Sequence, residues 1–189
     1  MVPERVYPTE RTGPFPHPPS TLEDGQGRQI SLSSLKPDEP RVEELVEMYS
    51  TYDPADRAQG IPPTGESAVR DWLQDILDSG INLVAVHDTV VGHATLVPDV
   101  APGTTIVDPG AHEWELAIFV THSHQRAGIG RALLEHVLGR AAARGVEFVW
   151  LTVERWNTPA IALYSSVGFE ECGTERFEYE MSIRLEGPD

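Results

Sequence analysis

The chain has a single cysteine, almost no lysine and no long hydrophobic run. Because Cys172 is alone, no disulfide can form within the chain. No apolar run approaches the roughly 18 residues that span a bilayer. The N-terminus also lacks the basic and then apolar segments of a secretory signal. We therefore expect a cytoplasmic protein with no membrane partner.

Positive charge is also scarce. The 189 residues include 14 Lys and Arg against 30 Asp and Glu, a net charge of -16, and Lys36 is the only lysine. Because nucleic-acid binding needs clustered Lys and Arg, we expect no nucleic-acid partner. The charge favours a cationic substrate over an anionic one. Adaptation to high salt and origin in a GC-rich genome are both consistent with this composition.

Proline is concentrated at the N-terminus, where Pro3, Pro8, Pro14, Pro16, Pro18 and Pro19 occur. Because proline disfavours both helices and sheet ladders, residues 1–27 are predicted to form a flexible or draped arm. Residues 28–189 are long enough to form one domain with its own core.

From residue 28 onward, the apolar spacing alternates between strand and helix periods. Strands are predicted over 29–35, 82–87, 90–97, 113–120, 146–153 and 177–185. Helices are predicted from Pro40, over 66–79, between Gly128 and Gly145, and over 158–166. This order indicates an α/β domain with a mixed sheet.

Two glycines, Gly128 and Gly130, stand where a strand gives way to a helix. Unpaired N–H groups and the helix dipole attract anions at such a point, and glycine lets the backbone approach a phosphate closely. Arg126 and Arg131 could add charge-assisted hydrogen bonds. A tight turn that needs glycine only for its geometry is the alternative. The dinucleotide fingerprint does not fit, because Leu133 stands at the third glycine position, and no Gly-Lys-Ser/Thr follows.

Two signatures in order carry a family resemblance. Gln125-x-x-Gly128-x-Gly130 resembles the pyrophosphate loop of GNAT-type N-acetyltransferases. Asn157-Thr158-Pro159-Ala160, then Leu163-Tyr164 and Val167-Gly168-Phe169, resemble the second signature of that family. The resemblance is close over 113–173. It implies the GNAT acyltransferase fold, a mixed and mostly antiparallel sheet of about six or seven strands flanked by about four helices.

The resemblance further implies acetyl-CoA, or a related acyl-CoA, as the donor, with no metal. In this family the strand before the loop splays from the next strand, and the pantetheine arm lies in the gap. The donor-binding residues that it implies are Ile118, Phe119, Val120, Gln125, Arg126, Ala127, Gly128, Ile129, Gly130, Arg131, Asn157, Ala160 and Tyr164.

The resemblance also implies which residues take part in catalysis. Tyr164 matches the tyrosine that serves the departing sulfur, although a core aromatic would show the same spacing. Related ribosomal-protein alanine acetyltransferases carry a glutamate where this chain has Thr152. Glu115 is therefore the candidate general base and Glu113 a substitute on the same strand face, with solvated glutamates and bulk water as alternatives. His122 and His124 lack a third ligand and do not predict a metal site.

The predicted reaction is direct acetyl transfer from acetyl-CoA to a primary amine of a small molecule or peptide, in a ternary complex. The resemblance places the acceptor near Tyr49, Tyr52, Asp53, Asp56, Arg57 and 60–64. A non-catalytic acyl-CoA-binding or sensory domain of the same fold is the alternative. Family habit makes a homodimer plausible.

Overall fold

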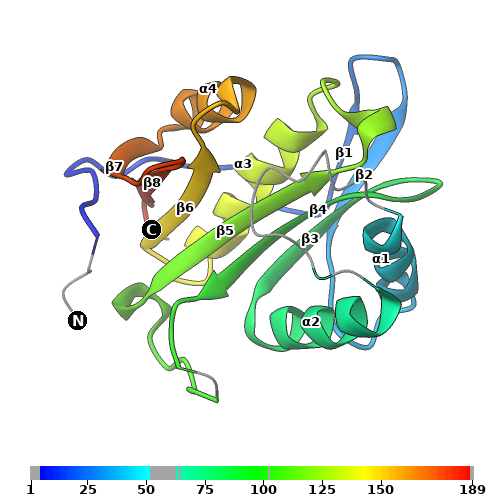
Figure 1. Ribbon diagram of the computed structural model, residues 1–189, viewed down its shortest axis with the longest axis horizontal. Helices are drawn as coiled ribbons and strands as arrows, with labels where there is room; N and C mark the ends of the chain where they lie inside the picture. The colour runs from blue at the N-terminus through cyan, green and yellow to red at the C-terminus, as the bar shows by residue number, and fades with distance from the viewer. Residues whose placement is uncertain (1–4, 52–62, 64, 102, 188–189) are drawn as a thin grey trace.

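The computed structural model describes residues 5–51, 63, 65–101 and 103–187. Within them, eight strands form one sheet in the order β1-β2-β3-β4-β5-β6-β8-β7 (Figure 1). The strands are β1 Ser20–Glu23, β2 Gln29–Ser34, β3 Ile81–His87, β4 Thr89–Pro98, β5 Glu113–Val120, β6 Phe148–Glu154, β7 Glu170–Thr174 and β8 Glu178–Arg184. The helices are α1 Arg41–Ser50, α2 Glu66–Ser79, α3 Ile129–Ala142 and α4 Thr158–Val167, with short 3-10 turns η2 Pro109–Ala111 and η3 His122–His124.

The predicted fold is confirmed, with more strands than the expected six or seven. One of them, β1, lies inside the segment expected to form an arm and pairs antiparallel with β2. The last proline of that segment is Pro19, so the strand begins where consecutive backbone N–H groups become available. None of the helices in the described part of the chain is long and apolar enough to cross a membrane.

The sheet has a hydrophobic core on each face, as the period-two pattern of its strands requires. On one face α3 packs against Trp114 and Leu116 of β5 and other buried side chains. On the other face α1 and α2 cover Phe119 of β5 and the adjoining parts of β3 and β4. Figure 1 shows α1 and α2 on one side of the sheet and α3 on the opposite side.

The β5–β6 pair is the only parallel pair among the described strands, because the α3 crossover connects these two strands. Its register covers three residue pairs and ends at Glu115 opposite Trp150. Beyond these residues both strands continue, to Val120 and Glu154, without pairing with each other. The two strands therefore diverge toward their C-terminal ends, and Figure 1 shows β6 and α4 separating from β5.

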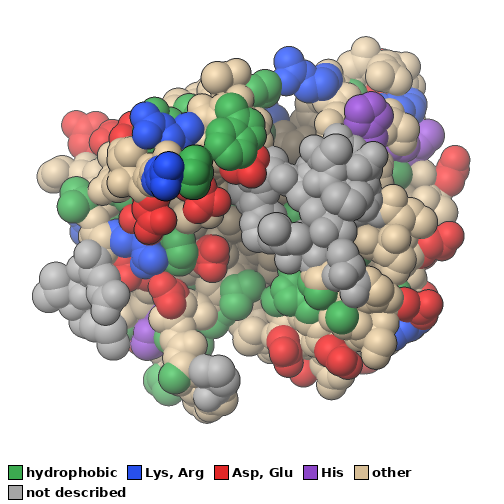
Figure 2. Space-filling view, viewed as in Figure 1, with side chains coloured by type: hydrophobic (Ala, Val, Ile, Leu, Met, Phe, Trp, Pro, Cys, Tyr) green, Lys and Arg blue, Asp and Glu red, His purple; other side chains and the backbone are tan. Residues whose placement is uncertain are grey.

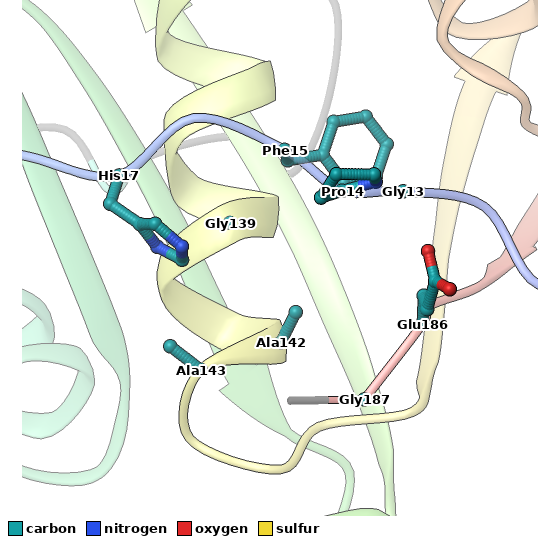
Figure 3. Close-up of a pocket in the computed structure, with 9 residues that line it drawn as sticks. All are labelled: Gly13, Pro14, Phe15, His17, Gly139, Ala142, Ala143, Glu186 and Gly187. Atoms are coloured by element: carbon teal, nitrogen blue, oxygen red, sulfur yellow. The ribbon is translucent and has the colours of Figure 1, made fainter. Parts of the chain in front are cut away.

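The N-terminal arm packs along the domain. Thr12 pairs with Leu185 beyond β8, and its N–H donates to the Arg184 carbonyl over 2.8 Å. Further along, the arm crosses α3 so closely that a Cβ at Gly139 would collide with the Pro16 carbonyl oxygen. A cavity lies between the arm, the last turns of α3 and Glu186 (Figure 3). It is at the opposite end of α3 from Gly128 and Gly130.

Candidate active site

The turn from β5 to α3, residues 125–131, is called the anion loop below. Two of its residues have left-handed backbones, Arg126 with φ of 60° and Gly128 with φ of 91°. The Gln125 amide donates to the Val120 carbonyl over 3.0 Å and ties the loop to the end of β5. The N–H groups of Arg126, Ala127 and Gly128 have no hydrogen-bond acceptor among the described residues. Unpaired donors at a helix N-terminus suit an anionic ligand.

The two glycines are present for different reasons. Gly128 needs its left-handed backbone, so the tight-turn explanation is sufficient for it. Gly130 has no such backbone, and a Cβ there would make only ordinary contacts of 3.9 Å with Leu163 and Val120. The fold itself therefore tolerates a larger residue at Gly130. Its missing side chain leaves space between the end of β5 and α4, as a ligand lying in the divergence would require.

The two loop arginines have different surroundings. Arg126 is exposed. Arg131 pairs with Glu135 at 2.9 Å and donates to the Ser166 hydroxyl over 3.0 Å. Arg131 therefore links the start of α3 to α4 across the divergence. The other loop residues, Ala127 and Ile129, are buried and anchor the loop to the core.

The turn between β1 and β2 supports the anion loop. The Gly25 N–H donates to the Ala127 carbonyl over 2.9 Å, and the Arg28 guanidinium donates to the Ser123 carbonyl over 3.0 Å. Arg28 also pairs with the buried Asp24 at 2.6 Å. Burial opposes ionisation of Asp24, but hydrogen bonds from Arg28 and from the Gln26 N–H outweigh it and lower the Asp24 pKa to about 2.

Asn157 and Ala160 begin α4 on the other side of the divergence. Asn157 is the N-cap residue, and its Oδ1 accepts from the Ala160 N–H over 3.2 Å. The Asn157 Nδ2 has no acceptor among the described residues. The predicted binding asparagine therefore caps the helix with one end of its side chain and retains a donor at the other.

Tyr164 lies on α4, about two turns after the start of the helix. Its side chain is buried, and its ring packs edge-on against Phe169 with 5.7 Å between centroids. The helix in which it lies begins at Asn157 and borders the divergence of β5 and β6. The ring belongs to the core on the α3 side, and its helix borders the candidate site. This position is consistent with both interpretations of Tyr164, the catalytic tyrosine and the core aromatic.

The two candidate bases share a strand face, as predicted, but their surroundings differ. Glu115 is exposed next to Trp150, at the last β5–β6 pair. Partial removal of water raises the pKa of Glu115, the Asp99 charge raises it further, and Arg5 opposes both. Glu113 accepts hydrogen bonds from the Tyr7 hydroxyl at 2.8 Å and the Arg5 N–H at 3.3 Å. The N-terminal arm thus engages Glu113, while Glu115 stands closer to the divergence.

The predicted pantetheine strand, Ile118 to Val120, lies on the diverging part of β5. Ile118 and Val120 face α3, whereas Phe119 faces α1 and α2. The neighbouring His124 contacts His87 at 3.2 Å, and no group of three or more metal-ligating side chains occurs in the described residues.

Tyr49, which was predicted to lie near the acceptor, is buried in the core that α1 and α2 form on the sheet. Its hydroxyl bonds the His93 Nδ1 at 2.7 Å, and the His93 Nε2 contacts the Asn82 oxygen at 3.1 Å. Burial lowers the His93 pKa to about 3, so this histidine is neutral. Tyr52, Asp53, Asp56, Arg57 and residues 60–62 and 64 lie outside the described residues.

The sequence did not indicate three contributors to this region. Arg5, Trp150 and the Asp24–Arg28 turn reach the site only through contacts between residues far apart in the chain. A periodicity or motif does not record such contacts. The one local signal was Asp24-Gly25-Gln26-Gly27, a turn-forming run that precedes a predicted strand.

Comparison with known proteins matches the Acetyltransferase (GNAT) family model to residues 42–169. The [Ribosomal protein bS18]-alanine N-acetyltransferase of Escherichia coli K12 is 48% identical over 62 residues, which are 33% of this chain and 42% of that protein. Phosphinothricin N-acetyltransferase of Streptomyces viridochromogenes is 34% identical over 113 residues, 57% of this chain and 58% of that protein. The chain thus spans less than two thirds of either relative.

A solved structure has the same fold. A putative acetyltransferase from Salmonella typhimurium, determined with its cofactor acetyl-CoA, superposes with a TM-score of 0.61 at 19% identity. The superposition covers 83% of this chain and 94% of that one.

Proposed function

Because the chain belongs to the Acetyltransferase (GNAT) family, we propose that it transfers an acetyl group from acetyl-CoA to a primary amine. The divergence of β5 and β6 beside an anion loop supports this proposal most directly. A two-part ligand with a pyrophosphate and an extended arm fits these two features together.

The residues fit the pyrophosphate and the pantetheine arm of acetyl-CoA. The unpaired N–H groups of the anion loop and the Arg126 guanidinium would bind the pyrophosphate. The space at Gly130 would admit the adjoining chain, and the Asn157 Nδ2 would donate to it. Ile118 to Val120 would bind the pantetheine arm along β5. Acetyl-CoA supplies the activated thioester.

The proton transfers are assigned to two side chains. Glu115, whose pKa is raised, removes a proton from the acceptor ammonium group, directly or through water. The neutral amine nitrogen then bonds to the carbonyl carbon of the thioester. As the carbon–sulfur bond breaks, the Tyr164 hydroxyl donates a proton to the departing sulfur. The second proton of the nitrogen passes through water to the Tyr164 oxygen, and Glu115 releases its proton to solvent. Glu113 is less suited to the base role because Tyr7 and Arg5 already engage its carboxylate.

A small molecule or peptide with a primary amine is the proposed acceptor. The relatives differ in acceptor, since one is named for a ribosomal protein and the other for phosphinothricin. The negative charge of this chain favours a cationic acceptor. Acidic side chains on α1 and α2 are visible at the lower right of Figure 2, and acidic and basic ones intermingle at its left.

The direct experiment measures CoA release from acetyl-CoA with a panel of monoamines, diamines, amino acids and peptides, at low and molar salt. We expect amine-dependent release. Tight acetyl-CoA binding by calorimetry with no release for any amine would favour a non-catalytic acyl-CoA-binding domain. Absence of binding would contradict the proposal.

A further inference from the structure

Arg5, on the N-terminal arm, occupies a site built from three strands and the residue that follows β4. Its guanidinium carbon lies 3.4 Å from the centroid of the Trp150 ring. Around it, Arg5 Nη1 lies 3.2 Å from Asp99 and 3.6 Å from Glu113, and Arg5 Nε lies 3.5 Å from Glu180. An aromatic face and several carboxylates together form a strong environment for an organic cation.

Among the described residues, three carboxylates surround the Arg5 guanidinium. Glu115 stands on β5, opposite Trp150 of the adjacent strand β6. The Arg5 Nε is buried and has only the long contact to Glu180. Arg5 therefore pairs imperfectly with the carboxylates around it.

The position of the site connects it to the candidate reaction centre. Trp150 pairs with Glu115 at the last β5–β6 position, directly before the strands diverge. Thr152, two residues along β6 on the same face, is the cross-strand partner of Glu180. The Arg5 charge is close enough to affect the ionisation of Glu115. A cation in this site would thus lie beside the proposed base, where β5 and β6 begin to diverge.

The contacts that hold Arg5 belong to a peripheral segment. The Ser182 hydroxyl donates to the Val6 carbonyl over 2.7 Å, and Tyr7 bonds Glu113. Val6 itself is largely exposed, and the Tyr7 ring packs edge-on against Phe148 with 4.9 Å between centroids, so Tyr7 anchors the arm next to Arg5. Exchange of Arg5 for another cation would leave the sheet and both cores in place.

We propose that Trp150, Asp99, Glu113 and Glu180 form a cation subsite of the acceptor cleft, which takes an alkylguanidinium or alkylammonium group and which Arg5 occupies when no acceptor is bound. The assignment to the acceptor cleft rests on the proposed acetyltransferase function. It specifies the acceptor class as amines with a second cationic group, which displace the arm from the subsite.

Binding tests the subsite without catalysis. Arg5→Ala is expected to bind methylguanidinium roughly tenfold more tightly than the wild type in calorimetry, since one cation–π and charge site is vacated. Arg5→Ala/Trp150→Leu should lose this gain. Arg11→Ala is the matched control, because Arg11 pairs with Glu147 outside the subsite. Equal binding by the wild type and Arg5→Ala, or by Arg5→Ala and the double variant, overturns the proposal.

A second measurement uses only the wild-type protein and so does not depend on the folding of a variant. In the wild type, tens of millimolar methylguanidinium, a concentration of roughly the order at which weak cation sites fill, should speed hydrogen exchange at the Arg5 amide, which donates to Glu113. Sodium chloride at equal ionic strength is the control. Exchange that does not change with methylguanidinium overturns displacement of the arm.

Kinetics distinguishes this inference from the proposed function. Arg5→Ala should lower the KM for 1,4-diaminobutane about tenfold relative to butylamine. If Arg5→Ala turns over both amines with no such change in KM, the proposed acetyltransferase function stands and the proposal that the subsite belongs to the acceptor cleft is wrong. If the protein binds methylguanidinium but turns over no amine, the cation site stands and the proposed acetyltransferase function is wrong.

Discussion

The Gly25 N–H donates to the Ala127 carbonyl oxygen over 2.9 Å, which joins the β1–β2 turn to the anion loop. In a trans peptide the carbonyl and the following N–H point in opposite directions. This bond therefore directs the Gly128 N–H away from the β1–β2 turn. Arg28 holds the start of the same region through the Ser123 carbonyl. The hairpin thus fixes the direction of an N–H group that we propose binds the pyrophosphate.

Arg28→Ala is predicted to weaken acetyl-CoA binding about tenfold. A hydrogen bond from a charged group contributes about 1.5–3 kcal/mol, and about 1.4 kcal/mol corresponds to tenfold in affinity. Calorimetry with the folded variant measures the dissociation constant. Arg41→Ala is the matched control, because Arg41 pairs with Glu44 on α1. An Arg28 variant that binds acetyl-CoA like the wild type would remove the hairpin from the binding site.

Gly130→Ala is predicted to lower acetyl-CoA affinity without lowering the melting temperature. The added methyl group meets only Leu163 and Val120 at ordinary distances, and alanine favours a helix over glycine by up to about 1 kcal/mol. Stability should therefore stay constant or rise while the space for the ligand is lost. Gly187→Ala, where a Cβ meets no described atom, is the control. Equal affinity in both variants would show that no ligand uses the space at Gly130.

Tyr164→Phe is predicted to reduce kcat by about 10- to 100-fold with little change in acetyl-CoA affinity. The substitution removes one hydroxyl proton donor and keeps the ring that packs on Phe169. Steady-state rates and calorimetry measure the two effects separately. Tyr179→Phe is the control and should retain the wild-type kcat, because Tyr179 lies on β8 and its ring contacts Arg155. An unchanged kcat in Tyr164→Phe would place Tyr164 in the core only.

The sequence predicted the parts of the site that lie close together in the chain. The glycine spacing located the anion loop, the Asn157-to-Tyr164 run located α4, and the alternation in 113–120 placed Glu113 and Glu115 on one face. These features depend on local periodicity and turn chemistry. The divergence of β5 and β6 entered through the family resemblance, and the three-residue register bears it out.

Long-range contacts account for what the sequence did not show. The arm was expected from its prolines, but its contacts through Arg5 and Tyr7 join residues more than 90 positions apart. The same contacts give Glu113 surroundings that differ from those of Glu115, although the strand pattern places both on one face. Tyr49 was expected near the acceptor, and the sequence did not show that its hydroxyl bonds the buried His93, 44 positions away. A pattern in one segment cannot contain the partner supplied by another.

Glu115→Gln is predicted to lower kcat/KM about 100-fold and to abolish the rise of kcat/KM with increasing pH on the acid side. A base acts in its deprotonated form, so the wild-type rate rises as pH passes upward through the Glu115 pKa. Because partial removal of water and the Asp99 charge raise that pKa, the rise should lie above the range of an ordinary glutamate. Asp99→Asn should shift it to lower pH by removing a neighbouring negative charge.

Glu113→Gln, measured in the same pH series, should keep the rise. If Glu115→Gln retains the wild-type profile, another group or water accepts the proton. Ionisation of the acceptor amine acts at higher pH and is common to all variants, so it does not obscure the comparison.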